Sequence, residues 1–146
     1  MATNPSVGTF DPKKVIVTFG EVVFSGYAEG TFINVSRSGD AFEKRKGSDG
    51  SVDRINKNAY DCTAELTLMQ TSPTNDLLSA ILIQDQLSNT GIRPLTISDL
   101  SGTSLFFAPL AWIRVDPNDE KADSLGNRTW TFDTGIAEKF TGGNIL

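Results

Sequence analysis

The side chains that most often carry catalysis or bind metals are scarce in this sequence. Histidine is absent, and cysteine occurs once, as Cys62. Without an imidazole there is no histidine general base or zinc ligand, and one cysteine cannot form a disulfide within the chain. Cys62 lies on the apolar side of an alternating segment, where a thiol behaves as a small core residue rather than as a nucleophile.

Carboxylates are densest in DPNDEKAD, residues 116–123. The segment is as acidic as a calcium loop, but it lacks the glycine at the sixth position and the glutamate at the twelfth. We interpret it as a solvated acidic turn. No glycine-rich loop leads from a strand into a helix, and no serine has a lysine partner in a defined setting. We therefore expect no enzyme, no metal and no cofactor.

Basic residues are concentrated between residues 37 and 57. This stretch holds six basic and four acidic residues, a net charge of +2, which leaves −7 for the rest of a chain whose net charge is −5. Two interpretations remain open: a solvated loop, or an arm that docks on an acidic surface, such as residues 116–123 of a second copy. Unlike surfaces that meet between identical chains give head-to-tail contacts, which close into rings or continue as filaments. The candidate contact residues are Arg37, Asp40, Lys44, Arg45, Lys46, Arg54, Lys57, Asp116, Asp119 and Glu120.

The composition bounds the class of protein. With 146 residues, 38% of them hydrophobic and 21% charged, the chain is long enough for one domain with a core and should fold. The absence of disulfides fits a reducing compartment or a protein that has never needed them. The opening MATNPSVGTFDP lacks the basic start and apolar run of a signal peptide, and no apolar cluster is long enough to cross a bilayer, so no membrane anchor is expected. The acidic balance argues against attraction to nucleic acid.

Alternation of apolar and polar residues predicts about seven or eight short strands. They are expected within residues 15–25 (with a tight turn at Gly20-Glu21), 31–37, 40–46, 59–70, 93–100, 103–115 and 128–136. In 59–70, Cys62, Ala64, Leu66 and Leu68 share the face that packs on a core. The opposite face, together with that of 128–136, presents Thr63, Glu65, Thr67, Thr129, Thr131 and Asp133 to water or to a wet surface. Pro109 predicts a bulge or an edge in 103–115.

One segment, residues 72–91, predicts an amphipathic helix. Ser72 is expected as the N-cap, Pro73 as the first helical residue and Gly91 as the stop. The apolar stripe consists of Leu77, Leu78, Ile81 and Leu82, and the residues that face away are Gln84, Asp85 and Gln86. Residues 47–58 and 116–127 are predicted loops, and residues 1–12 a flexible arm. The expected fold is one mainly β domain over residues 1–146, a β-sandwich or partly closed barrel with one flanking helix.

The order of these segments resembles the inner tail tube protein family of contractile-tailed bacteriophages. The resemblance rests on FDPKKVIVTFGEVVFSGYAEGTFINVSR, DAFEKRKGSDG, AELTLMQTSPTNDLLSAI, PLTISDLSGTSLFFAPLAWIRV and NRTWTFDTG, which cover nearly the whole chain. The LMQTSPTNDLLSAI segment is the most distinctive, because strand, cap and helix follow without a spacer.

The resemblance implies a virion structural protein that assembles into stacked hexameric rings. These form a hollow tube inside a contractile sheath, with baseplate and tail-terminator proteins at the ends and phage DNA passing non-specifically through the bore. The location would be the virion tail, assembled in the cytoplasm of the host bacterium. Residues 38–58 match the loop or hairpin that reaches from one ring to the next in this family.

Two points stay open at this stage. The six polar residues named above are candidates for the lumen, because an acidic and hydroxyl-rich bore would repel DNA phosphates, but the same face could instead meet the sheath. The alternative function is a surface β-sandwich module that binds carbohydrate or protein. Such a module predicts exposed aromatic residues at a loop tip, whereas Trp112 and Trp130 fall within strands.

Overall fold

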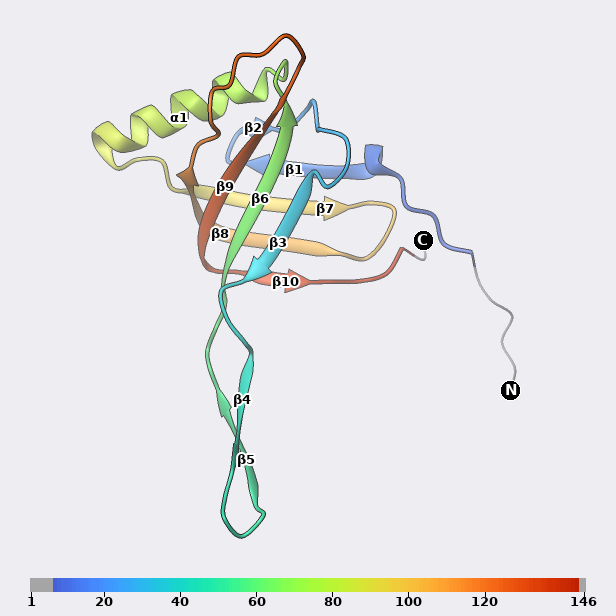
Figure 1. Cartoon of the computed structure of the whole chain (residues 1–146), viewed down its shortest axis with the longest axis vertical. Helices are drawn as coiled ribbons and strands as arrows, with labels where there is room; N and C mark the ends of the chain where they lie inside the picture. Colours follow the sequence, from blue (N-terminus) through green and yellow to red (C-terminus); the bar gives the residue numbers. More distant parts are fainter. Residues whose placement is uncertain (1–6, 145–146) are drawn as a thin grey trace.

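A computed structural model describes residues 7–144 of the chain. Within this range the structure holds ten strands, one α-helix and one short 3-10 helix (Figure 1). Their bounds are η1 Pro12–Lys14, β1 Val15–Phe19, β2 Val22–Val23, β3 Ile33–Arg37, β4 Phe42–Lys46, β5 Val52–Asn56, β6 Asp61–Met69, α1 Thr74–Ser88, β7 Arg93–Asp99, β8 Leu105–Val115, β9 Asn127–Ile136 and β10 Glu138–Phe140. Residues 1–6 of the predicted arm over residues 1–12 lie outside the described residues.

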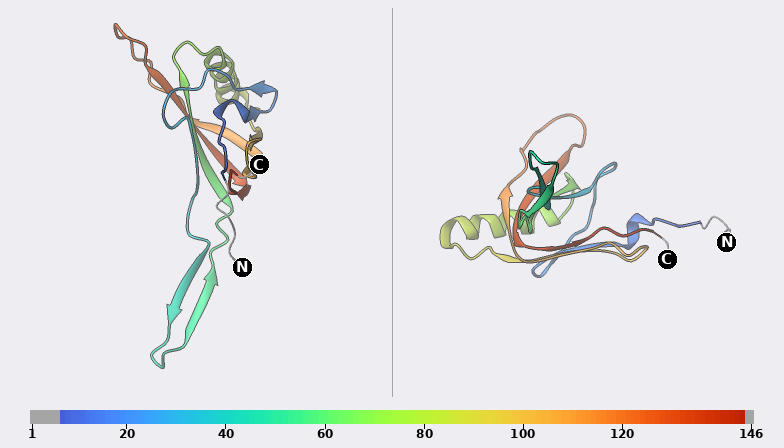
Figure 2. Two further views of the ribbon diagram at one scale, coloured as in Figure 1. Left: turned by 90° about the vertical axis from the view of Figure 1, so that its right-hand side faces the viewer. Right: turned by 90° about the horizontal axis from the view of Figure 1, so that it is seen from below.

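Eight strands form one antiparallel sheet in the order β2-β1-β7-β8-β9-β6-β3, with β10 also paired to β8. The sheet folds over on itself, so that β1, β7, β8 and β10 form one layer and β9, β6 and β3 the other (Figure 2). It does not close, because β3 ends the path unpaired on its far side. The expected partly closed mainly β fold with a helix on its flank is confirmed.

The alternation of β6 and β9 forms the centre of the core, as predicted. Leu66 and Leu68 are fully buried, and Trp130 and Phe132 of the neighbouring strand lie beside them. The ring of Phe132 meets that of Phe19 edge to face, with 5.0 Å between centroids, a favoured geometry for aromatic pairs. The two layers are therefore joined through large apolar side chains.

The predicted turn at Gly20-Glu21 and the predicted bulge at Pro109 are both present. Gly20 adopts a φ of 61° in the tight turn between β1 and β2, a conformation that glycine reaches without strain. Pro109 lies where the β7–β8 register slips by one residue, which is a bulge in β8. The strand after Gly20 is shorter than predicted, and β10 was not predicted at all because three residues carry no periodic signal.

The helix is present and starts one residue later than predicted, with the Ser72 hydroxyl still capping the backbone at its start, but the predicted stop at Gly91 is wrong. It begins at Thr74, and the hydroxyl of Ser72 accepts from the Thr74 amide while donating to the Ser25 carbonyl. The C-cap is Asn89, in the left-handed conformation at φ 56°, and Gly91 follows two residues later. Asparagine tolerates this conformation better than most residues, so the helix stops before the glycine.

The predicted apolar stripe is also partly wrong. Leu78 is fully buried and Ile81 and Leu82 pack against the core, but Leu77 is 51% exposed. Asp85, expected to face away, is half-buried and accepts a hydrogen bond from the Gly91 amide at 3.0 Å. Over residues 7–144 there is no helix long and apolar enough to cross a membrane.

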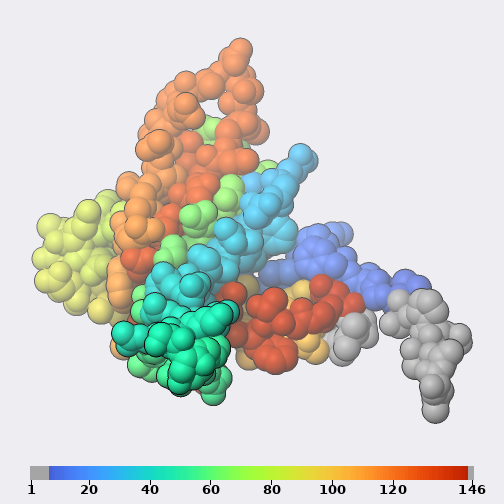
Figure 3. Space-filling view, turned by 60° about the horizontal axis from the view of Figure 1, so that its bottom comes forward, coloured from blue at the N-terminus to red at the C-terminus, as the bar shows by residue number. Residues whose placement is uncertain are grey.

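The predicted loop over residues 47–58 is wrong, because it contains strand β5. β4 and β5 pair only with each other and form a hairpin that projects from the body along the longest axis (Figure 1). Figure 3 shows this hairpin in front of the body, seen from the side of its tip. The turn between them is closed by the Gly47 amide donating to the Ser51 carbonyl at 2.8 Å, with Gly50 at φ 89°. Polar composition suggested a loop, yet cross-strand pairing forms a strand without any buried face.

Candidate functional site

The six residues predicted to share a polar face lie together on the outer side of β6 and β9. In the strand register Thr63 is opposite Asp133, Glu65 is opposite Thr131, and Thr67 is opposite Thr129. Directly opposed side chains in an antiparallel pair are close enough to interact. The structure therefore brings all six into one patch, which we call the polar face.

Hydrogen bonds hold part of this polar face in place. Thr63 Oγ1 donates to Asp133 Oδ1 at 3.1 Å, and the hydroxyls of Thr67 and Thr129 are 3.2 Å apart. Arg114 Nε lies 3.1 Å from Asp133 Oδ2. The carboxylate of Asp133 is thus neutralised locally, whereas Glu65 is exposed.

The polar face extends to the neighbouring strands. Asn34 and Ser36 of β3 are opposite Glu65 and Thr63, and Trp112 of β8 is opposite Asp133. Trp112 and Arg114 were missed as members of this face. Within the described parts of β3, β6, β8 and β9, Arg114 is its one cation, so the hydrated face has a negative balance.

The predicted basic arm is the β4–β5 hairpin, and its cations lie on an exposed stalk. The side chains of Lys44, Arg45, Lys46 and Arg54 project from the two strands, all of whose residues are exposed. Lys57 Nζ lies 3.1 Å from Glu43 Oε2. Asp40 is exposed in the segment before β4.

Arg37 has a different environment from the other predicted cations. It ends β3 at the base of the hairpin, and its Nη1 donates to the carbonyls of Tyr60 at 2.7 Å and Ala137 at 3.1 Å. Arg37 therefore ties the hairpin base to the body within one subunit.

The predicted acidic residues Asp116, Asp119 and Glu120 lie between β8 and β9, at the opposite end of the longest axis from the hairpin (Figures 1 and 2). Asp119 Oδ1 accepts from Lys121 Nζ at 2.6 Å and from Arg128 Nη2 at 3.1 Å. The hydrogen bond from Lys121, and secondarily the charges of Lys121 and Arg128, hold the pKa of the Asp119 carboxyl below its usual value. Asp116 and Asp119 line a polar cleft of about 330 Å³ together with the first turn of α1.

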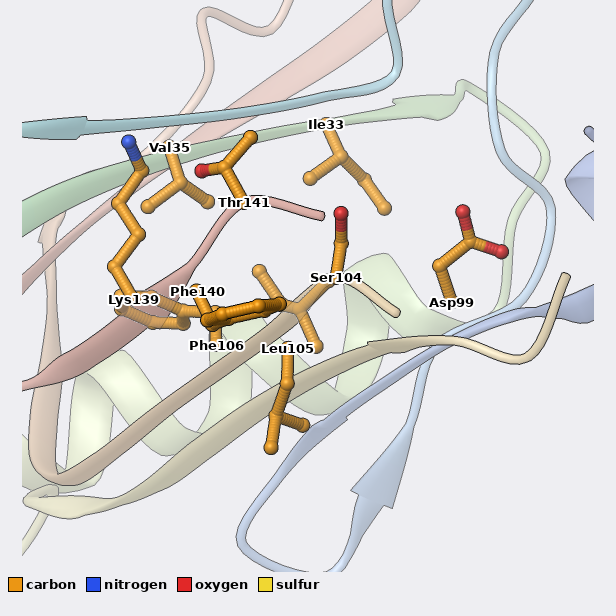
Figure 4. Close-up of a pocket in the computed structure, with 10 residues that line it drawn as sticks. Ile33, Val35, Asp99, Ser104, Leu105, Phe106, Lys139, Phe140 and Thr141 are labelled. Carbon is orange, nitrogen blue, oxygen red and sulfur yellow. The ribbon is translucent and has the colours of Figure 1, made fainter. Parts of the chain in front are cut away.

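An apolar cleft marks the unclosed side of the sheet. It has a volume of about 330 Å³ and lies between β3, which contributes Ile33 and Val35, and β8 and β10, which contribute Phe106 and Phe140 (Figure 4). Asp99 lies at its rim, where the Ser101 hydroxyl and then the Asn144 amide lower the pKa of the carboxyl. The lining offers apolar surface and no cluster of reactive groups.

The groups that could do chemistry are dispersed. Cys62 is buried, and burial raises the pKa of its thiol, which makes a thiolate nucleophile unfavourable. Residues 7–144 contain no group of three or more histidine, cysteine, aspartate or glutamate side chains placed to hold a metal ion. Polar and charged side chains are instead grouped on three surfaces: the polar face, the hairpin, and the polar cleft at the end of the molecule opposite the hairpin.

No family model matches the chain. Its sequence is 26% identical over 144 residues to "Structural protein ORF10" of Pseudomonas phage KPP10, covering 93% of this chain and 83% of that protein.

The fold is shared with chains from contractile injection systems. The tube-terminating cap of the anti-feeding prophage aligns with a TM-score of 0.64 at 14% identity, over 96% of each chain. The sheath/tube terminator of an extracellular contractile injection system, PVC, aligns with a TM-score of 0.63 at 13% identity, over 96% of this chain and 100% of that one. A chain of the PVC sheath–tube complex aligns with a TM-score of 0.57 at 14% identity, over 90% and 93%. The similarity is thus to a phage structural protein in sequence and to injection-system chains in fold.

Proposed function

We propose that this chain is a structural subunit of a contractile phage tail, which assembles into stacked hexameric rings and forms the inner tail tube. Phage DNA passes through the bore without specific contacts, the sheath surrounds the tube, and baseplate and terminator proteins meet its ends. The subunit acts in the virion tail after assembly in the cytoplasm of the host.

The observation that carries this proposal is the polar face, on a fold shared with injection-system chains. A bore must let a polyanion pass without binding it, and exposed cations would retain phosphates. The polar face is dominated by hydroxyls, amides and carboxylates, with Met69 and Trp112 beside them, and its one described cation, Arg114, is paired with Asp133. Lateral joining of subunits through the unpaired edge of β3 would also remove an edge that otherwise invites uncontrolled pairing.

A cysteine-accessibility experiment tests the orientation of the polar face. Thr131 and, as a matched control, Leu87 on the helix are each replaced by cysteine, while the buried Cys62 gives little background. Assembled tubes are treated with a small maleimide and with a maleimide coupled to a protein too large to enter a bore. We expect Thr131→Cys to react with the small reagent only and Leu87→Cys with both. Equal labelling of Thr131→Cys by the large reagent would place the polar face outside and refute a lumen role.

We propose that the segment 38–58 connects successive rings through the β4–β5 hairpin. The Lys57 amide donates to the Ala41 carbonyl at 3.1 Å, so the chain ends adjoin where the hairpin leaves the body. Replacing residues 42–56 by two glycines removes both strands, whereas cutting 47–56 alone would leave β4 without its partner. We expect the shortened protein to fold and form rings but no long tubes in negative-stain micrographs. Full-length tubes from this variant would show that the hairpin has another role.

A second candidate is a terminator at one end of a tube, because two of the similar structures are a cap and a terminator. A subunit that stacks on itself needs complementary surfaces at both ends, whereas a terminator needs one. The basic hairpin and the acidic segment at opposite ends favour self-stacking. Labelling with a specific antibody on intact virions separates the two: signal along the tail supports the tube, and signal confined to one end supports the terminator.

A further inference from the structure

The two faces of the β4–β5 hairpin carry different charges. In the strand register Lys44 is opposite Arg54 and Lys46 is opposite Val52, which places three cations on one side of the ribbon. Phe42 lies on this side as well, and the Arg54 guanidinium sits 4.5 Å from the centroid of its ring. No acidic residue of β4 or β5 shares this side, which we call the basic face.

The opposite side of the hairpin is balanced. Glu43 pairs with Lys57 at 3.1 Å, and Arg45 is opposite Asp53. The positive excess of the hairpin therefore lies on the basic face alone. Like charges directly opposite each other destabilise a strand pair, so the Lys44–Arg54 pair is a site where an anionic surface would relieve repulsion.

A negative counterpart lies at the other end of the molecule, in the polar cleft between the first turn of α1 and the segment after β8. Asp76, Asp116 and Asp119 line it with one cation, Arg128. Asp119 is already held by Arg128 and Lys121. Asp76 and Asp116 are exposed, and within the described chain their side chains take part in no hydrogen bond or ion pair. The cleft thus has two carboxylates available to a cationic partner.

The placement of these two surfaces suits a second copy of the same chain. The hairpin lies at one end of the longest axis, and the segments that line the cleft, the start of α1 and the chain after β8, lie at the other (Figures 1 and 2). A copy displaced along that axis brings its hairpin to the cleft of the next. Such a contact joins unlike surfaces and repeats without limit, as axial stacking requires.

We propose that the basic face of the hairpin, through Lys44, Lys46 and Arg54, docks into the polar cleft of a second copy and contacts Asp76 and Asp116 there. The proposal rests on the ring-stacking function and specifies which hairpin face and which receptor make the contact. It adds Asp76 on the helix to the acidic segment recognised in the sequence.

Charge reversal with rescue tests this contact. One variant carries Lys44→Glu and Arg54→Glu, a second carries Asp76→Lys and Asp116→Lys, and a third carries all four changes. The matched control is Arg45→Glu, a cation on the balanced side of the same hairpin. Ring formation is followed by native mass spectrometry, and tube growth by sedimentation and negative-stain microscopy in low and high salt.

We expect each double variant to form rings while raising the subunit concentration needed for tube growth about tenfold or more, the scale of one close interfacial charge pair. The fourfold variant should recover tubes, Arg45→Glu should assemble as the unmodified chain does, and high salt should weaken stacking of the unmodified chain. Unchanged tube growth by Lys44→Glu/Arg54→Glu, or failure of the fourfold variant to recover, overturns the proposed docking. Absence of rings and tubes from the unmodified chain refutes the ring-stacking function itself, which is a separate outcome.

Discussion

Leu77 and Leu78 are neighbours in the helix, and the structure predicts very different costs for truncating them. Leu78 is fully buried on the side of α1 that faces the core, whereas Leu77 is 51% exposed. Removing a fully buried leucine side chain loses its transfer free energy and leaves a cavity, so Leu78→Ala should lower the free energy of unfolding by about 3 kcal/mol. Leu77→Ala loses about half of the transfer free energy and leaves no cavity, so about 1 kcal/mol is expected.

The assay is urea unfolding of the unassembled subunit, followed by tryptophan fluorescence. Trp130 is a suitable reporter because it is buried and its Nε1 donates to Asn75 Oδ1 at 2.9 Å. We expect the midpoint of Leu78→Ala to fall at an unchanged slope, and its melting temperature to fall by roughly 10 °C for a domain of this size, against about 3 °C for Leu77→Ala. Equal losses in the two variants would refute the helix orientation and restore the stripe predicted from the sequence.

Two further predictions concern a backbone conformation and a carboxylate. Asn89 has a φ of 56°, so Asn89→Ala should cost about 1 kcal/mol of unfolding free energy whereas Asn89→Gly should be nearly neutral; equal urea midpoints would contradict this. The pKa of Asp119 is lowered by the hydrogen bond from Lys121, so its ion pair should stabilise the fold above the usual aspartate pKa and be lost as pH falls through the lowered one. An NMR titration should show the pKa of Asp119 rising in Lys121→Gln, and an unchanged value would disprove the coupling.

Period-two alternation predicted most of the sheet, because strands that are buried on one side only need an apolar residue at every second position. The six residues of the polar face were identified from that alternation, and the strand register places them opposite one another. Trp112 was missed because the bulge at Pro109 changes the parity of β8. Counting from Phe106 and Ala108 places Trp112 inside, whereas after the bulge Ala111 and Ile113 are the buried residues.

Other features depend on contacts between distant segments, which local patterns do not encode. The hairpin has no buried face, so composition predicted a loop for residues 47–58, and only the pairing of β4 with β5 reveals a strand. The start of the helix is anchored by a contact that is distant in sequence, since Thr74 is buried and its Oγ1 accepts from the Ser25 amide at 3.1 Å. Asp76 carries no signal in the sequence beyond its place near a helix start, and its position in the cleft follows from the hydrogen bond that joins Asn75 of α1 to Trp130 of β9.

The start of α1 links the stability of the subunit to the proposed stacking contact. The Asn75 side chain accepts from Trp130 and donates to the carbonyls of Met69 at 3.0 Å and Ser72 at 3.1 Å, so its orientation is fixed by three partners. Asp76 is the next residue, and its carboxylate is therefore presented by a turn that is anchored to the core. In the proposed contact, the backbone that carries Asp76 is thus already ordered, so docking has to order only the Asp76 side chain. The single helix of this mainly β chain thus covers apolar core residues. The hydrogen bonds of Asn75 that anchor its first turn also position Asp76, a candidate receptor residue for the next copy.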